Sequence, residues 1–497
     1  MPRPMIAREQ TAVRNVGLLL VLRGLLIAGG VVVAAVVPRL MGPTGYGQVA
    51  LLVALSFWFT LTASLGFTQV IGRHVPQFGQ TGDDAGLRDF FGRLLAIRLV
   101  AGLLAAGLYL AVTATWLRDL DALAMAILAL AVFVRAPAGL FFSLYLGLNQ
   151  AARWGVADIV RQWGTLAFML PGYLVAGLRG AAAGVLLAEL VVLLVGIIGA
   201  RCYLTWAAFR IDLNGMAPYL RFGLIFYVSD LVLAAFERSG EALVRARCGD
   251  YAQVGFFGVG YSAYVTAAVG IPQIALAFAP LLTVLRMEGD RAAVRLWIER
   301  LLKWLALGSV TVVLAAVLVG GDLVPRILGA VYRPVSANLI LLAIGLVALS
   351  LTSVANLSAL THDRPAVALV AAVLRLGSFW LLGLSFVGHW GSWGASLAVL
   401  GAVAAQAGFF TWRMRRVVGY SLRTWLWVVG LGAIFLPLAL LRSSPAVNAA
   451  LFGAFVVGYG GLLFLLRLVT PGELGVMWRA VVGVPGSSLA ASDGETR

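Results

Sequence analysis

Five charged side chains fall inside long apolar stretches of the sequence and are the strongest candidates for chemistry: Arg23, Arg135, Glu189, Asp230 and Arg375. A charge at the centre of a bilayer costs roughly 2.5–3.5 kcal/mol on insertion scales, so such residues usually serve binding or transport. Three guanidinium groups against two carboxylates leave a surplus of one positive charge, and guanidinium suits bidentate capture of phosphate. The set favours an anionic ligand. Pairing that only holds helices together is the alternative for Arg23 and Asp230.

The elements that must position these residues are membrane-spanning helices. The chain has 497 residues, of which 61% are hydrophobic and 12% charged, and its mean hydropathy is +0.97. Soluble domains average about 25% charged residues and rarely contain apolar runs of about 18 residues, yet such runs follow one another from Val16 to Val469. At about 20 residues per crossing, the sequence predicts an all-α polytopic membrane protein with about fourteen transmembrane helices.

Basic residues are spread unevenly over the connections between the predicted spans. Alternate connections, counted from the N-terminus, hold 24 Lys or Arg residues, whereas the others hold nine, Arg238 among them. Because cytoplasmic loops carry the excess, both termini are predicted to be cytoplasmic. Arg98, near the end of its span, is expected to extend its side chain to the interface. The net charge of +16 fits loops that face anionic lipid, and no basic stretch interleaved with aromatic residues indicates nucleic acid.

An internal repeat organises the spans. The stretch YGQVALL from Tyr46 recurs as YAQVGFF from Tyr251, and Gly177 is one of several residues that recur 211 positions later, in its case as Gly388. We predict two six-helix lobes related by pseudo-symmetry, two added helices and a cytoplasmic tail, with the boundaries 1–212, 213–416, 417–470 and 471–497. Six spans per lobe make the repeat parallel, with a substrate site between the lobes near the midplane. An offset of 207 places Arg23 and Asp230 at matching heights on the first helix of each lobe.

Signals for enzymatic chemistry are weak. The three histidines, His74, His362 and His389, are scattered over separate connections without metal-ligand partners at working spacing, so we expect no metal site. No serine, cysteine or histidine grouping resembles a nucleophilic centre. Asp119-Leu-Asp121 matches the D-x-D pattern of metal-dependent glycosyltransferases, but three residues match by chance often. Glu237 and Glu241, beside Arg238, are interpreted as a solvated helix end. We therefore expect a protein that is not an enzyme.

One segment resembles a known family. Residues Leu40 to Pro76 read LMGPTGYGQVALLVALSFWFTLTASLGFTQVIGRHVP. This resembles the signature of the polysaccharide (O-antigen or exopolysaccharide) flippase family of the MOP transporter superfamily, which has an L-G-P-x-x-Y-G turn before the second span and an L-G-hydrophobic motif at its end, here Leu65-Gly66-Phe67. The six-plus-six organisation with two added spans is also similar to that family.

The resemblance implies a flippase that moves an undecaprenyl-diphosphate-linked oligosaccharide across the bacterial cytoplasmic membrane by alternating access. Arg23 would face the diphosphate, since a basic residue on the first helix is typical of such flippases. From the charge argument, Arg135 and Arg375 would join it, Asp230 would neutralise Arg23 in the empty cavity, and Gln69 and Gln273 would bind sugar hydroxyls.

Several alternatives and partners stay open at this point. The rivals are a cation-coupled multidrug exporter, a lipid II flippase, and a membrane polymerase or ligase of the same pathway. The expected partners are the lipid-linked oligosaccharide, membrane lipids and other polysaccharide-assembly proteins, but not nucleic acid. No cofactor is expected, and a coupling ion, H⁺ or Na⁺, is left undetermined.

Overall fold

Helices make up almost all of the computed structural model, which describes residues 5–148, 150–204 and 209–470. The described α-helices are α1 (Met5–Ser64), α2 (Phe67–Thr81), α3 (Asp84–Trp116), α4 (Ala122–Gly147), α5 (Ala151–Ala200), α6 (Leu213–Glu237), α7 (Gly240–Cys248), α8 (Tyr251–Ala268), α9 (Gly270–Ala277), α10 (Ala279–Met287), α11 (Arg291–Ala315), α12 (Gly321–Leu328), α13 (Val335–Thr361), α14 (Pro365–Val418), α15 (Arg423–Ala433) and α16 (Pro445–Leu465). A π-helical segment, Ala316–Gly320, joins α11 to α12. The predicted all-α polytopic class is confirmed.

Eleven helical segments of the described residues are long and apolar enough to cross a membrane. Three of them, Gly24–Ser64, Gly155–Tyr203 and Pro365–Val418, run for 41, 49 and 54 residues. One crossing of a hydrocarbon core about 30 Å thick needs only about 20 residues. Each of these three segments is therefore long enough to cross twice.

Each of the three long helices is broken by backbone angles that a helix does not have. The breaks lie at Gly42 in α1, at Ala176 and Gly177 in α5, and at Gly391 in α14. Gly177 (φ 57°, ψ −135°) and Gly391 (φ 56°, ψ −133°) share a positive-φ conformation that glycine adopts without steric cost. The two matching turns are 214 positions apart, whereas the sequence repeat paired Gly177 with Gly388. Apolar helices resemble one another at several alignments, so the sequence match slipped by three residues here.

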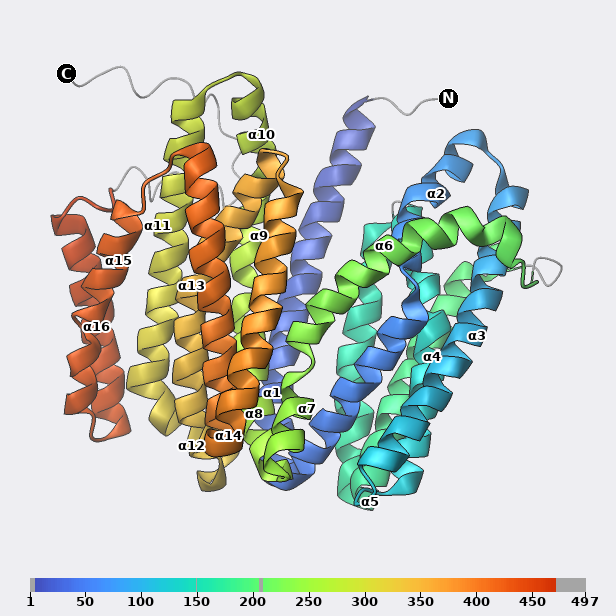
Figure 1. The fold of residues 1–497 in the computed structure, drawn as a ribbon, viewed down its shortest axis with the longest axis horizontal. Helices are drawn as coiled ribbons and strands as arrows, with labels where there is room; N and C mark the ends of the chain where they lie inside the picture. The colour runs from blue at the N-terminus through green and yellow to red at the C-terminus, as the bar shows by residue number, and fades with distance from the viewer. Residues whose placement is uncertain (1–4, 149, 205–208, 471–497) are drawn as a thin grey trace.

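The helices form two groups, with the first part of α1 between them and α6 running across the first group towards the middle (Figure 1). Helices α2 to α5 lie on one side, and α8 to α14 lie on the other, with α15 and α16 at the far edge (Figure 1). The described part of the chain begins and ends at the same end of the molecule (Figure 1). The predicted boundaries at residues 212, 416 and 470 stay predictions, and the predicted tail, 471–497, lies outside the described residues.

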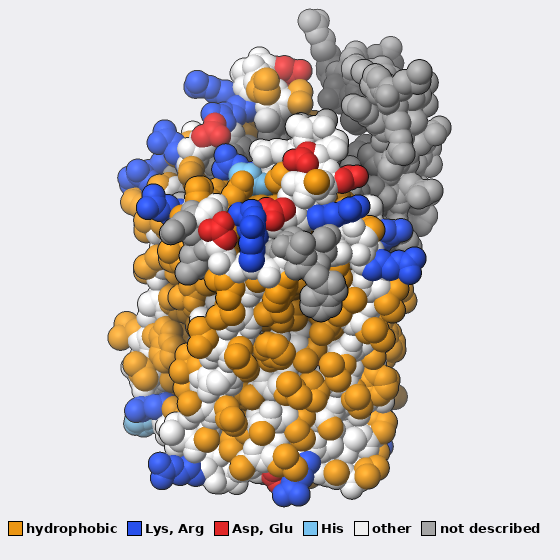
Figure 2. All heavy atoms as spheres, turned by 90° about the vertical axis from the view of Figure 1, so that its right-hand side faces the viewer, with side chains coloured by type: hydrophobic (Ala, Val, Ile, Leu, Met, Phe, Trp, Pro, Cys, Tyr) orange, Lys and Arg blue, Asp and Glu red, His pale blue; other side chains and the backbone are white. Residues whose placement is uncertain are grey.

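The surface of the first group is apolar over most of its height. Figure 2 shows hydrophobic side chains covering this face, with Lys and Arg side chains gathered mainly towards the end that carries the termini. Leu104 on α3 is 69% exposed and Val175 on α5 is 89% exposed. Apolar patches of this extent are unfavourable in water and suit a lipid environment.

Arg98 does not extend to the interface as predicted from the sequence. Its side chain is buried, its Nε donates to the Ala136 carbonyl at 2.9 Å, and its Nη1 donates to the Ala63 carbonyl. Arg98 therefore links α3 to α4 and to the end of α1. Two backbone acceptors satisfy the guanidinium inside the bundle, which removes the need to reach water.

Candidate functional site

The candidate site centres on a break between α6 and α7. Helix α6 ends at Glu237, and α7 begins at Gly240 after Ser239, both residue types that favour helix ends over helix interiors. Arg238 lies eleven residues before the left-handed turn at Gly249. The side chains of Glu237 and Arg238 are exposed at this break, whereas Ser239 and Glu241 are buried. The exposed Glu237 at the end of α6 fits the solvated helix end predicted from the sequence, whereas the buried Glu241 does not.

On one side of this break, a carboxylate lies between two arginines. Glu189 Oε1 of α5 lies 2.8 Å from Arg161 Nε and 3.5 Å from Arg135 Nε. The Glu189 side chain is 4% exposed, and Asp158 binds Arg161 from a second direction at 3.1 Å. The charge of Arg238 is close enough to act on Arg135. In this conformation the predicted ligand Arg135 is therefore engaged in an ion pair.

On the other side, Arg375 of α14 forms no ion pair or hydrogen bond with any described residue. Its guanidinium carbon lies 4.1 Å from the centre of the Phe236 ring, and its Nε is buried without an acceptor. Its electrostatic neighbours are Glu237 and the tyrosines Tyr261 and Tyr264 of α8. An aromatic ring thus holds the guanidinium in place, while its hydrogen-bonding capacity is unused.

Arg238 is a second guanidinium that has no carboxylate partner in the described part of the chain. It lies over the Phe57 ring at 4.7 Å, and its carbonyl accepts a hydrogen bond from Trp58 Nε1 at 3.2 Å. The formal charges around the break are balanced: Arg135, Arg161, Arg238 and Arg375 against Asp158, Glu189, Glu237 and Glu241. The distinguishing feature is therefore two positioned guanidinium groups with free donors, an arrangement that suits an oxyanion such as phosphate.

The other residues predicted for the site lie apart from this pair of arginines or outside the description. Asp230 of α6 lies near Gln69 of α2, so the fold brings these two predicted residues together. Gln273 of α9 is exposed, and its side chain forms no hydrogen bond within the described residues. The side chain of Arg23 lies outside the described residues, so its predicted pairing with Asp230 stays a prediction.

The two groups of helices meet most closely at the end remote from the termini, where the two copies of the repeated segment cross. A Cβ added to Gly47 would overlap the carbonyl oxygen of Tyr251, and one added to Gly255 would overlap that of Pro43. Backbones approach this closely only where a side chain is missing. Tyr332 adds a hydrogen bond from its hydroxyl to the Pro38 carbonyl at 2.6 Å. This crossing, which we call the remote seal, packs the groups together on one side of the site.

Two ion pairs lie near the remote seal, and one of them, Asp119 with Arg245, links the first group to α7. Asp119 binds Arg245 of α7 at 2.8 Å, and Asp121 binds Arg179 of α5 at 2.6 Å while accepting two backbone N–H bonds at the start of α4. The hydrogen bond from Arg179, together with these N–H groups, lowers the pKa of Asp121. The D-x-D pattern of the sequence therefore has a structural role in ion pairing and helix capping.

At the opposite end, α6 packs against the first group of helices. Asp212, before α6, binds Arg93 of α3 at 2.7 Å, and Arg73 of α2 lies 4.6 Å from the centre of the Phe222 ring. Helix α6 is thus fixed to the first group, while α7 packs on α14 of the second. The α6–α7 break joins the two groups at the candidate site.

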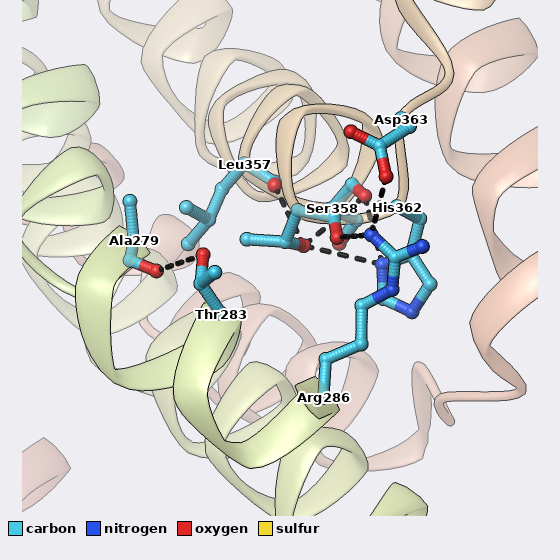
Figure 3. Close-up of polar contacts among 8 residues, drawn as sticks. Ala279, Thr283, Arg286, Leu357, Ser358, His362 and Asp363 are labelled. Atoms are coloured by element: carbon cyan, nitrogen blue, oxygen red, sulfur yellow. Dashed lines mark hydrogen bonds and ion pairs between the residues drawn. The ribbon is translucent and has the colours of Figure 1, made fainter. Parts of the chain in front are cut away.

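A cluster at this end, drawn in Figure 3, ties α10 to the turn after α13. Arg286 binds Asp363 at 2.9 Å and donates to the carbonyl of Thr361. His362 Nδ1 donates to the Ser358 carbonyl at 3.0 Å, and burial lowers the pKa of His362. Among the described residues, no group of three His, Cys, Asp or Glu side chains could hold a metal ion.

Comparison with known proteins assigns a family to this arrangement. The model of a family described as "Polysaccharide biosynthesis protein" matches residues 12–286, more than half of the chain. The chain belongs to the polysaccharide biosynthesis protein family. The resemblance carried by Leu40 to Pro76 is thereby confirmed. No curated protein sequence matches the chain.

Solved structures show that this polysaccharide biosynthesis protein has the fold of the MOP superfamily. The lipid II flippase MurJ, in an inward closed conformation, superposes with a TM-score of 0.66 at 14% identity, over 91% of this chain and 100% of MurJ. An inward-facing MATE transporter of the MOP superfamily gives 0.64 at 14% identity, over 80% of this chain and 94% of the transporter. A Vibrio cholerae MATE transporter gives 0.51 at 14% identity, over 84% and 98%.

Two arginines at the site of this family member were not singled out from the sequence. Arg161 is not among the predicted site residues, and the sequence assigns Arg238 to a connection between spans. The repeat contained the missing signal for Arg238. An offset of 207 pairs Gly42, the turn of α1, with Gly249, which places Arg238 well before the turn.

Proposed function

We propose that this protein is a flippase for an undecaprenyl-diphosphate-linked oligosaccharide and works by alternating access without enzymatic chemistry. The observation that carries the proposal is the pair Arg238 and Arg375, two guanidinium groups near the α6–α7 break that lie on aromatic rings and form no ion pair with a described carboxylate. A diphosphate offers oxygens that guanidinium binds bidentately. The lipid tail would stay in the bilayer while the head group crosses.

The predicted ligands take different parts in this proposal. Arg375 fits the role of a diphosphate ligand best, whereas Arg135 would have to exchange Glu189 for substrate. Arg23, Asp230, Gln69 and Gln273 stay predicted substrate contacts. Gln69 lies on α2 and Asp230 on the neighbouring α6, so these two side chains would separate when α6 moves.

We further infer fourteen crossings, two lobes of six and two added helices. The inference rests on the three long, broken helices. Each of them is one of the eleven apolar segments but would cross the membrane twice. An even number places both termini on one side, and the described part of the chain begins and ends on one side in Figure 1. The excess of basic residues in connections on that side supports a cytoplasmic location in a bacterial inner membrane.

In this proposal, the described conformation is the one that receives substrate from the cytoplasm. The remote seal blocks the outer side because the backbones at Gly47 and Gly255 leave no room for a side chain. Release to the outside would require the seal to part and α6 to leave α2. MurJ and the first MATE transporter are likewise described as inward-facing or inward closed.

The test is export in cells depleted of the native protein. Arg238→Ala combined with Arg375→Ala should lower polymer export at least about tenfold, because each hydrogen bond to a charged group contributes roughly 1.5–3 kcal/mol. The lipid-linked oligosaccharide should accumulate on the inner leaflet. Arg413→Ala, which removes an exposed arginine outside the site, is the matched control.

Three outcomes would contradict the proposal. Normal export by the double variant, at equal protein level, would show that these arginines do not bind the substrate. Accumulation of a peptidoglycan precursor would favour a lipid II flippase. Drug sensitivity of depleted cells with unchanged polymer export would favour a multidrug exporter.

A further inference from the structure

Two adjoining cavities lie where α14 ends and α15 begins, at the end of the molecule that carries the termini. Their volumes are about 440 and 620 Å³, and Arg415 and Leu422 line both. Neither cavity belongs to the candidate site around Arg238. Helix α15 lies at the far edge of the second group, next to α16 (Figure 1), so the cavities face the surroundings of the protein.

The lining of these cavities has a cationic rim. Arg415 and Arg416 follow one another at the end of α14, and Arg423 opens α15. Arg415 Nε is fixed by a hydrogen bond to the Tyr420 carbonyl at 3.2 Å, and the Arg416 guanidinium lies 4.2 Å from the centre of the Trp412 ring. The other guanidinium nitrogens of the three arginines form no ion pair with a described residue.

Among the described residues, no carboxylate lines either cavity. The nearest acid on the neighbouring helix is Glu299 of α11, which accepts a hydrogen bond from the Ser421 N–H at 2.6 Å and binds Arg295 at 3.1 Å. Its Oε1 is thus already engaged with α11 and with the start of α15. The three arginines therefore present uncompensated positive charge towards the cavities.

Below this rim, α15 presents an apolar column. Leu426, Gly430 and Ile434 follow Arg423 at helical spacing on one face; Leu426 is 59% and Ile434 65% exposed. A Cβ at Gly430 would meet no atom within 4 Å, so the column is open in its middle. From Arg423 to Ile434 the column is about 16 Å long, close to half of a hydrocarbon core of about 30 Å.

We propose that this rim and column form a site for one anionic glycerophospholipid. The phosphate would bind Arg415, Arg416 and Arg423, and an acyl chain would lie along Leu426, Gly430 and Ile434. The length of the column favours this occupant, because it matches the depth of one leaflet below a head group. A free anion would leave the column empty. The site is independent of what the protein transports.

The experiment is native mass spectrometry of the purified full chain in detergent, titrated with phosphatidylglycerol, with phosphatidylethanolamine of the same chains, or with inorganic phosphate. The wild type should retain one phosphatidylglycerol in preference to the other two. In the triple variant Arg415→Gln, Arg416→Gln, Arg423→Gln, binding should weaken on the order of a hundredfold, since each arginine near a membrane surface contributes roughly fivefold. Arg413→Gln, which removes an exposed arginine of the same helix end outside the lining, should bind as the wild type does.

A second variant tests the column without touching the charges. Gly430→Leu fills the open middle of the column and should weaken phosphatidylglycerol binding, with the thermal midpoint of unfolding as the check on folding. Equal binding of phosphatidylethanolamine, or full retention by the triple variant, would overturn the proposal. Displacement of phosphatidylglycerol by an equal concentration of phosphate would also overturn it, because the column would then contribute nothing.

Discussion

Replacing Glu189 with Gln should destabilise the protein far more than replacing Asp158 with Asn, although both carboxylates bind Arg161. Glu189 contacts Arg161 at 2.8 Å and Arg135 at 3.5 Å, and its side chain is 4% exposed. Asp158 contacts Arg161 at 3.1 Å, but its side chain is 56% exposed. The two substitutions therefore remove the same kind of charge from the same arginine at very different burial.

The expected magnitudes follow from that burial. Removing one partner of a buried ion pair costs about 3–5 kcal/mol, because the remaining charge is left uncompensated. Arg161 and Arg135 retain 20% and 25% exposure, so the cost of Glu189→Gln should lie near the lower bound, about 3 kcal/mol. An exposed pair contributes about 1 kcal/mol at most, which limits Asp158→Asn.

The assay is equilibrium unfolding of the purified protein in mixed micelles, with the difference in unfolding free energy as the readout. A third variant, Glu189→Gln with Arg161→Met, should recover part of the loss, since replacing both partners by groups of similar volume is much less costly than breaking the pair. Equal effects of the two single substitutions, or a stabilising effect of Glu189→Gln, would refute the reasoning about burial.

Three further predictions concern the two ends of the molecule. Gly47→Ala should weaken the remote seal by about 1–3 kcal/mol, because the new Cβ overlaps the Tyr251 carbonyl. In a protein whose native cysteines are replaced, a cysteine introduced by Ser262→Cys should then be labelled faster from outside. The control Gly107→Ala, whose new Cβ meets no atom within 4 Å, should leave the labelling rate unchanged. Asp119→Asn should destabilise the remote seal by less than about 1 kcal/mol, and by still less in high salt, because the Asp119 side chain is 48% exposed. The labelling rate should therefore rise less than with Gly47→Ala, and an equally large rise would contradict this ranking. Thermal stability should fall as the pH drops through about 6.5. The pKa of His362 is lowered in the folded state, so the unfolded chain takes up the proton first. A pH profile of stability that His362→Gln leaves unchanged would show that another group is responsible.

Hydropathy was sufficient to predict the helical class of this protein. Apolar runs from Val16 to Val469 leave a polytopic helical chain as the only arrangement that satisfies the backbone in lipid. The segment from Leu40 to Pro76 was sufficient for the family, because its turn and glycine motifs are local in sequence. Both conclusions depend on properties of contiguous residues, which a single sequence displays directly.

Ion-pair partners were beyond the reach of the sequence. It marked Arg135, Glu189 and Arg375 as costly charges, but which of them bind one another depends on how helices rotate and tilt. Arg135 and Glu189 are paired, and Arg375 lies on Phe236 without a partner, an outcome that no spacing along the chain encodes.

The sequence by itself determined that these charges lie inside a membrane protein, because insertion cost depends on local composition. Only the tertiary structure showed that Arg238 lies on the Phe57 ring beside a helix break, because the break at Ser239 and Gly240 is a small local event in a span of ordinary apolar composition. The close crossing at Gly47 and Gly255 also depends on tertiary packing. Many glycines in this chain are available for close packing, and the packing of whole helices selects the few that are used.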